Sequence, residues 1–552
     1  MNEEKVKRER KKIEFWAEQI AEKIIAREKF SYLEKPLPSI KKWTVKSSSS
    51  LSGVLHIGRL SDIIRSEAVF RALKERGFPA EFIYVTEDMD PIRSIPKGVP
   101  KEFEKYAGFA VSDVPDPFGC HKSYALHFKE EFLKVLSDFL FEEPTVYSMR
   151  EEYKKGSFTE SILALAKKQD ELRAIIERVQ GSELPAEWNF WKPICDKCGN
   201  LQSTQVTKME GTKVYYKCVD YEFEKVLAKG CGFEGVQDLA KANGKMAWKS
   251  EWAGQWKFWQ VCSEGAGKDY NAPNSAWFVN AEICEKLLDF PMPEPIFYEH
   301  IIIGGEKMSA SKGNVVYPVE WLEVSRPEAL KYLYMKKINK TRNFLWAEVP
   351  ALERELDQAV EKTFEPGKTA DEKELLQANN LYKYSLTKKR KPSVIPFDYD
   401  LAVMFAQLFK DNDIALKALV EQGHLTGKEN KDVLSQAKER LDHARKWVEK
   451  YAPAEQRISF AESIPSGLKE KTGNDAKQAF NEIIALLPSL KTHEEIQTKI
   501  FEVIRKLALK PKAFFPLIYQ ALMARDQGPK LGSLILALGK EKVINRLKEL
   551  TK

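Results

Sequence analysis

The segment Ser50–Asp62, SLSGVLHIGRLSD, places one histidine and two glycines where a strand is expected to give way to a helix. Upstream, Trp43–Val45 is aromatic and β-branched, which favours a strand. Downstream, the apolar residues recur at helical spacing, which predicts a helix that begins near Gly58. Gly53 and Gly58 let the backbone approach a ligand closely, and the free N–H groups of a helix start suit a phosphate. His56 can donate to phosphate oxygens there. The segment therefore predicts a phosphate-binding corner, and an ordinary surface corner is the alternative.

Size and composition restrict the class of protein. A chain of 552 residues, 43% of them hydrophobic, is globular and too long for one core, so we expect three or more domains. The charged N-terminus lacks the apolar core of a signal peptide, and no run approaches the roughly 20 uncharged apolar residues of a membrane span. We therefore expect a cytoplasmic protein with no membrane partner. A net charge of +7 permits a polyanionic partner without requiring one.

Expected strands and helices alternate between residues 43 and 149, which indicates a parallel sheet. The apolar run Phe82–Val85 leads into a group of acids that includes Asp88. Ligands of parallel sheets bind beyond the carboxyl ends of the strands, so we expect His56 and Asp88 to lie at the same edge. From residue 318 onward strand signals are sparse and helical periodicity dominates.

A second glycine-flanked segment, IIIGGEKMSASKGN, occupies residues 301–314. An apolar strand is expected to end at the glycines and to lead into a loop with two lysines and two hydroxyl side chains: Lys307, Ser309, Ser311 and Lys312. Lysine charges, hydroxyls and backbone N–H groups can together wrap a polyphosphate. A loop that closes as negative charge develops would stabilise the transition state more than the ground state. An exposed Lys/Ser loop after an edge strand is the alternative.

Together the two segments resemble the HIGH and KMSKS signatures of class I aminoacyl-tRNA synthetases, in the same order along the chain. Further stretches are similar to the class I type of lysyl-tRNA synthetase, and the resemblance runs almost end to end. These stretches include FWAEQIAEKII, TEDMDPIR, DPFGCHKSYALHF, EEYKKGSF, WKSEWAGQWKFW, EGAGKDY and GPKLGSLILALG. The chain departs from the family pattern at Arg59, where asparagine or histidine is usual, at Ser48, where glycine is usual, and at Tyr270, where histidine is usual.

The resemblance implies an α/β Rossmann-type nucleotide-binding catalytic domain with a zinc-ribbon-like insertion, followed by an all-α C-terminal anticodon-binding region. The expected division has five parts. Residues 1–150 hold an N-terminal helix and the first half of the catalytic domain, and residues 151–245 hold the connective insertion with its zinc-binding ribbon. Residues 246–317 hold the second half of the catalytic domain with the KMSKS-like loop, residues 318–385 form a helical linking region that contacts the tRNA stem, and residues 386–552 form the anticodon-binding domain.

The resemblance also implies a reaction. L-lysine and ATP, with Mg²⁺, would give lysyl-adenylate and pyrophosphate, and the lysyl group would pass to the 3′ end of tRNA(Lys). The alternatives are a class I synthetase for another amino acid such as glutamate, a small-molecule adenylyltransferase, and a tRNA-binding relative without activity. A long helical C-terminal region and an insertion argue against the adenylyltransferase, and the intact His56 and KMSASKG segments argue against an inactive relative.

Site residues follow from the matched motifs. The resemblance implies that His56, Lys307 and Lys312 are catalytic. The ATP contacts that it implies are Gly53, His56, Gly58, Lys307, Met308, Ser309, Ser311 and Lys312.

A lysine substrate needs a carboxylate for its ammonium and flat apolar walls along its stem, where cation–π contact can assist. Asp88 is the first candidate acid, with Glu299 behind it, and a turn or helix-cap role is the alternative for Asp88. Core packing is the alternative for the aromatic candidates. The resemblance implies that Trp248, Tyr270 and Tyr298 are the aromatic walls, and the predicted lysine-binding set is Ser50, Asp88, Trp248, Tyr270, Tyr298 and Glu299.

Four of the seven cysteines form two pairs. Cys195 and Cys198 make a CxxC knuckle followed by glycine, while Cys218 and Cys231 are separated by twelve residues. A hairpin between the second pair could bring all four thiolates to one tetrahedral structural zinc, and unmetallated buried thiols are the alternative. The other three are isolated and are expected in the core: Cys120, Cys262 and Cys284.

Overall fold

The computed structural model describes residues 15–51, 53–96, 98–308, 313–368, 371–391, 393–409, 411–458 and 460–552. The chain divides into two compact units. The first runs to Val319 and also includes Leu330–Phe344 and Asn380–Arg390. The second comprises Glu320–Ala329, Leu345–Asn379 and Lys391–Lys552.

The first unit is built on a five-stranded sheet in the order β12-β11-β1-β2-β3, and every pairing in it is parallel. The strands are β1 (Trp43–Ser49), β2 (Ala80–Thr86), β3 (Thr145–Ser148), β11 (Val261–Gly267) and β12 (Glu294–Tyr298). The predicted parallel sheet is confirmed. From β1 the chain proceeds first toward β3 and later toward β12, so the topological switch point lies between β1 and β11.

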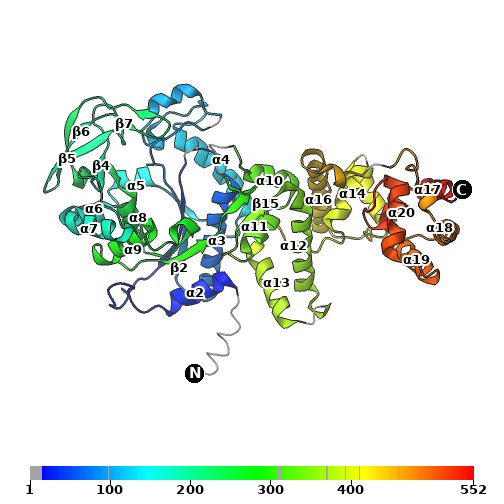
Figure 1. The fold of residues 1–552 in the computed structure, drawn as a ribbon. Helices are drawn as coiled ribbons and strands as arrows, with labels where there is room; N and C mark the ends of the chain where they lie inside the picture. Colours follow the sequence, from blue (N-terminus) through cyan, green and yellow to red (C-terminus); the bar gives the residue numbers. More distant parts are fainter. Residues whose placement is uncertain are drawn as a thin grey trace, which may run out of the picture. The chain divides into compact units, whose positions relative to one another are not determined.

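Helices pack around this sheet (Figure 1). The helix that the sequence predicts near Gly58 begins at Ile57. Ser123 caps the helix that begins at Tyr124, since its Oγ accepts from Leu126 N at 3.2 Å. The helices of this part are α2 (Trp16–Ala26), α3 (Ile57–Glu75), α4 (Tyr124–Phe139), α8 (Trp248–Phe258) and α9 (Ala276–Lys286). Trp256 and Trp277 are fully buried between α8, α9 and the sheet edge, and they anchor the core there.

An insertion separates β3 from β11. It starts with three helices: α5 (Met149–Lys155), α6 (Thr159–Lys167) and α7 (Gln169–Gln180). Short antiparallel strands follow, paired as β5-β6-β9, β4-β10 and β7-β8. Their bounds are β4 Trp191–Pro193, β5 Thr204–Glu210, β6 Lys213–Cys218, β7 Tyr221–Glu222, β8 Leu227–Ala228, β9 Glu234–Asp238 and β10 Gly244–Met246. The strands β4, β5, β6 and β7 lie together in Figure 1.

Beyond β12 the apolar strand expected at the start of residues 301–314 is present, and from residue 318 onward the chain is almost entirely helical, as the sequence predicts. A small sheet comes first, in the order β14-β13-β15: β13 Ile301–Ile303, β14 Glu306–Lys307 and β15 Arg342–Phe344. The helices are α10 Pro318–Val324, α11 Pro327–Met335, α12 Val349–Phe364, α13 Glu372–Ser385, α14 Tyr399–Leu408, α15 Asn412–Glu421, α16 Lys431–Lys450, α17 Leu468–Lys471, α18 Asn474–Leu486, α19 His493–Lys506, α20 Pro511–Met523, α21 Leu531–Leu538 and α22 Lys540–Thr551. Across the described residues, none of the helices has the length and apolarity that a bilayer crossing requires.

Candidate functional site

His56 is the N-cap of α3, and its Nδ1 accepts a hydrogen bond from the backbone N–H of Gly58 at 3.1 Å. Burial, followed by the nearby charges of Arg59 and Lys307, lowers the pKa of His56 to about 4. The imidazole is therefore neutral at physiological pH. Because Nδ1 is an acceptor, the ring proton resides on Nε2, which is thus a hydrogen-bond donor at the start of a helix.

The two signature segments lie side by side. The backbone N–H of Ile57 donates to the carbonyl oxygen of Val316 at 2.9 Å, and the Tyr334 hydroxyl donates to the carbonyl oxygen of Ile57 at 2.8 Å. A Cβ at Gly58 would lie 2.8 Å from Cε1 of His56 and 3.8 Å from Cε of Met308. Glycine at this position therefore leaves room for the imidazole, and Met308 of the second segment packs against the start of α3.

Lys307 is paired in this structure. Its Nζ lies 2.6 Å from Oδ2 of Asp269, the acid of the GKDY stretch, and Nε2 of His300 lies 3.2 Å from the same oxygen. The side chains of both Lys307 and Asp269 are more than half exposed. The other predicted members of this loop, Ser309, Ser311 and Lys312, lie outside the described residues.

Asp88 lies at the carboxyl edge, as predicted, two residues after β2. Its Oδ1 accepts from the backbone N–H of Arg150 at 2.8 Å and its Oδ2 accepts from the hydroxyl of Ser148 at 2.5 Å. These two donors belong to the N-terminal end of α5. The carboxylate thus holds a helix start, which is the cap role left open by the sequence.

Two of the three aromatic candidates form one wall. Trp248 stacks on Trp252 with ring centroids 4.7 Å apart, and Tyr270 meets Trp252 edge-on at 5.3 Å. The third, Tyr298, belongs to a different group, since its hydroxyl donates to Oδ2 of Asp62 at 2.7 Å and the Arg65 guanidinium lies 4.5 Å from its ring.

The remaining candidates are more peripheral. Glu299 accepts from Thr341 Oγ1 at 2.6 Å and lies 2.9 Å from Lys268 Nζ, and a quarter of its side chain is exposed. Ser50 is half-buried, and Gly53 is buried, with Pro96 Cγ 3.4 Å from where its Cβ would be.

Sequence reasoning missed a buried ion pair beside the wall. Lys46 on β1 and Glu264 on β11 are both fully buried, with Nζ and Oε1 2.5 Å apart. The other oxygen of Glu264 accepts from the indole N–H groups of Trp252 and Trp256 at 2.8 and 2.6 Å. The tryptophan-rich WKSEWAGQWKFW stretch was the available signal, because a buried indole N–H needs an acceptor.

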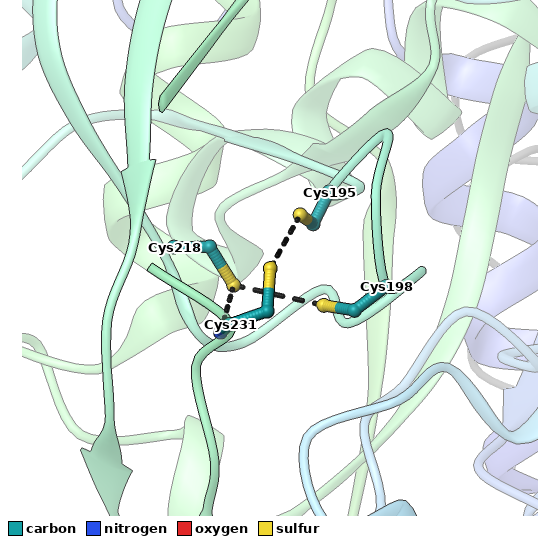
Figure 2. A group of neighbouring side chains, drawn as sticks. All are labelled: Cys195, Cys198, Cys218 and Cys231. Carbon is teal, nitrogen blue, oxygen red and sulfur yellow. Dashed lines mark hydrogen bonds between the residues drawn. The ribbon is translucent and has the colours of Figure 1, made fainter. Parts of the chain in front are cut away.

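The four paired cysteines converge, and the hairpin expected between Cys218 and Cys231 is present as β7-β8. Figure 2 shows their side chains pointing toward one another, and the Sγ atoms of Cys195 and Cys231, and of Cys198 and Cys218, are 3.7 Å apart in each pair. A tetrahedral zinc with Zn–S bonds of about 2.3 Å places its sulfurs about 3.8 Å apart. The four thiols therefore fit a zinc ion.

A second possible metal site corrects the expectation for Cys120. This cysteine is exposed rather than in the core, and its Sγ lies 3.1 Å from Nδ1 of His121 and 3.2 Å from Nδ1 of His127. A carboxylate oxygen of Asp116 completes the group, whose ligand atoms all lie within 4.8 Å of one another. Carboxylate, thiolate and imidazoles are also zinc ligands. By contrast, Cys262 and Cys284 are buried, as predicted.

Comparison with known proteins gives matches to family models, to relatives and to a solved structure. A family model described as "tRNA synthetases class I (K)" matches residues 14–388, and one described as "Anticodon binding domain" matches residues 455–551. The lysine–tRNA ligase of Pyrococcus furiosus is 31% identical, covering 97% of this chain and 99% of that protein. That of Methanocaldococcus jannaschii is 30% identical, covering 96% and 99%. A solved glutamate tRNA ligase from Elizabethkingia meningosepticum superposes loosely, with a TM-score of 0.39 at 14% identity over 92% of this chain and 99% of that one.

Proposed function

The chain belongs to the class I (K) family of tRNA synthetases, and from this premise we propose that it is a lysine–tRNA ligase that joins L-lysine to tRNA(Lys). The observation that carries the proposal is the nearly full-length match to proteins named lysine–tRNA ligase, at about 30% identity. The adjacent positions of His56 and Met308 at one helix start support it, because adenylate formation needs both signature segments at one nucleotide.

The proposed reaction has two steps. A carboxylate oxygen of lysine attacks the α-phosphorus of ATP, the bond between the α-phosphorus and the bridging oxygen breaks, and pyrophosphate leaves with that oxygen. A hydroxyl of the terminal ribose of tRNA then attacks the lysyl carbonyl, its proton is lost, and AMP departs. Both steps depend on positioning and charge stabilisation rather than on a covalent bond to the protein.

The described residues suit the first step. Nε2–H of the neutral His56 donates to a phosphate oxygen beside the N–H groups at the start of α3. Lys307 leaves Asp269 and moves to the departing pyrophosphate, since a polyphosphate carries more negative charge than one carboxylate. Mg²⁺ accompanies ATP, because it prefers phosphate oxygens and water to an all-protein cage.

The loop completes the ATP contacts in this proposal. Met308 packs at Gly58, and Gly53 borders the corner. Ser309, Ser311 and Lys312 supply hydroxyls and a second positive charge to the phosphates.

We assign the insertion and the C-terminal region by the same reasoning. Residues 151–245 would be the connective insertion, with a structural zinc that fixes the knuckle of Cys195 and Cys198 to the end of β6. Residues 386–552 would form the anticodon-binding domain, which includes the matched range 455–551. The anticodon of a tRNA is single-stranded, so this domain would recognise its bases by stacking and hydrogen bonding.

The test is ATP–pyrophosphate exchange with each of the twenty amino acids, with and without tRNA. Exchange with lysine alone, followed by formation of lysyl-tRNA(Lys), is the expected result. Exchange with glutamate or arginine instead of lysine would remove the proposal, and so would adenylation of a small molecule with no transfer to tRNA.

A further inference from the structure

Glu87 is a buried acid at the carboxyl edge of the parallel sheet. It follows β2 directly, its backbone N–H donates to the carbonyl oxygen of Ser49 at 2.9 Å, and only 4% of its surface is exposed. It is therefore next to the end of β1, where the predicted lysine-binding residue Ser50 follows.

Neighbouring acids already have strong donors. Glu264 accepts hydrogen bonds from the Lys46 ammonium and from two indole N–H groups, and Asp88 accepts from the Ser148 hydroxyl and from a backbone N–H. Glu251 accepts from the Tyr153 hydroxyl at 2.5 Å and pairs with the ammonium of Lys245 at 2.5 Å. None of these three carboxylates needs a further cation.

Glu87 differs from them. Among the described residues its carboxylate has one hydrogen-bonding side chain, Gln255, whose Nε2 lies 3.1 and 3.3 Å from the two carboxylate oxygens. Gln255 is itself fully buried, and its Oε1 has no hydrogen-bond partner within the part of the chain that the structure describes. When Glu87 is ionised, its two oxygens and Oε1 of Gln255 are three buried acceptors with a single donor, Nε2 of Gln255, among them, which is costly unless another donor arrives.

The surrounding charge favours a cation. The charged groups that act on Glu87 are Glu251, Asp90, Lys46 and Lys245, and both lysines are already paired with other acids. Burial first, and the charge of Glu251 next, raise the pKa of Glu87 to about 8. Glu87 therefore holds a proton near neutral pH until a cation replaces it.

The aromatic wall leads to this position. Trp248, Trp252 and Gln255 are spaced by four and three residues on α8, so they share one face of the helix. Trp252 also contacts Tyr270 edge-on. A flexible aliphatic stem that lies along these rings would carry its terminal group toward Gln255 and Glu87.

We propose that Glu87 and Gln255 receive the side-chain ammonium of the amino-acid substrate and thereby set the selectivity for lysine. The inference rests on the proposed function. The ammonium has three N–H donors, which match the two oxygens of Glu87 and Oε1 of Gln255. Asp88, the adjacent acid favoured by the sequence pattern, instead holds the start of α5.

The experiment compares lysine with norleucine, which has the same carbon chain but no ammonium, in ATP–pyrophosphate exchange by the full chain. Glu87→Gln keeps the size of the side chain and removes its charge. We expect the KM for lysine to rise roughly 100-fold, with the KM for ATP unchanged and the preference for lysine over norleucine reduced by a similar factor. Glu285→Gln is the matched control, because Glu285 is also fully buried but binds Arg27 and the Ser31 backbone.

A second readout separates binding from a structural role. Calorimetry of lysine binding at pH 7, in two buffers of different ionisation enthalpy, should show release of about one proton by the wild type and none by Glu87→Gln. If the wild type exchanges with lysine but Glu87→Gln has an unchanged KM for lysine, the inference is wrong while the proposed function stands. A selectivity loss confined to Asp88→Asn would also overturn it. Failure of the wild type to use lysine would instead overturn the proposed function.

Discussion

The backbone N–H of Ile57 donates to the carbonyl oxygen of Val316 at 2.9 Å. Ile57 is the residue after the N-cap histidine, and Val316 follows the lysine-bearing loop. The bond therefore fixes the C-terminal end of that loop beside the start of α3, and Met308 at its other end packs against Gly58. A phosphate bound at the helix start would lie next to both ends of the loop.

The neutral state of His56 gives a prediction for pH. Since burial and two neighbouring cations lower its pKa to about 4, its protonation state should not change between pH 6 and 8. Activation of the amino acid should therefore show no inflection from this histidine near pH 6.5. Proton NMR of the imidazole Cε1–H, assigned with His56→Asn, should show no titration above pH 5.5. A shift centred near 6.5 would contradict the lowered pKa of His56 and its neutral state at physiological pH.

Replacement of Lys307 should separate catalysis from stability. The Lys307–Asp269 pair is more than half exposed, so Lys307→Met should change the free energy of unfolding by less than about 1 kcal/mol. If the ammonium stabilises the leaving pyrophosphate, the same variant should slow activation by roughly 100-fold. Urea unfolding and single-turnover activation measure the two effects, with Lys340→Met as control, because Lys340 is an exposed lysine in the segment between α11 and β15. A normal rate in Lys307→Met would exclude the role.

Local sequence patterns predicted the framework of the site well. The switch from β-branched residues to helical spacing around Gly58 placed the start of α3 within one residue, and the acids after Phe82–Val85 lie at the carboxyl edge as expected. Such features depend on neighbours in sequence, which a periodicity describes. The CxxC knuckle belongs to the same class, because its spacing of two residues is itself a local turn.

Long-range partners were harder to predict. Glu87 and Asp88 are adjacent in sequence, yet one faces Gln255 of α8 and the other holds the start of α5. The pattern of acids cannot distinguish them, since the assignment depends on which helix packs over each side chain. Cys120 was expected in the core for a related reason: its partners Asp116, His121 and His127 become a possible metal site only when a tight turn and the first turn of α4 bring them together.

Metal content is predicted for both clusters. The purified chain should contain about two equivalents of zinc if each four-ligand group binds one ion. Cys198→Ser should lose one equivalent and lower the melting temperature, because the knuckle would no longer be tied to the end of β6. Elemental analysis measures the loss, and Cys262→Ser, which changes a buried isolated thiol, should leave the metal content unchanged. Zinc retained at the wild-type level in Cys198→Ser would contradict the assignment.

The cluster around Cys120 can be tested independently of the ribbon. Cys120→Ala should remove one equivalent of zinc, while Cys195 and its three partners keep their zinc ion. The double variant with Cys120→Ala and Cys198→Ser should therefore contain no stoichiometric zinc. Cobalt substitution gives a second measurement, because thiolate ligands produce charge-transfer bands whose intensity scales with the number of sulfurs. The wild-type spectrum should correspond to five thiolates, four from the ribbon and one from Cys120. A spectrum that does not change in Cys120→Ala would contradict metal binding there.

Breaking the buried Lys46–Glu264 pair should strongly destabilise the first unit. Both side chains are fully buried, so Glu264→Gln would leave the Lys46 ammonium without its counter-charge and should cost ~3–5 kcal/mol of unfolding free energy. The surface pair Lys42–Glu81 joins the same region at 2.6 Å but is partly solvated, so Glu81→Gln should cost less than about 1 kcal/mol. Urea unfolding without substrates measures both. Lys46→Met combined with Glu264→Gln should recover part of the lost unfolding free energy, because the combination removes the unpaired charge. If the double variant loses as much unfolding free energy as the two single variants added together, the two groups act independently.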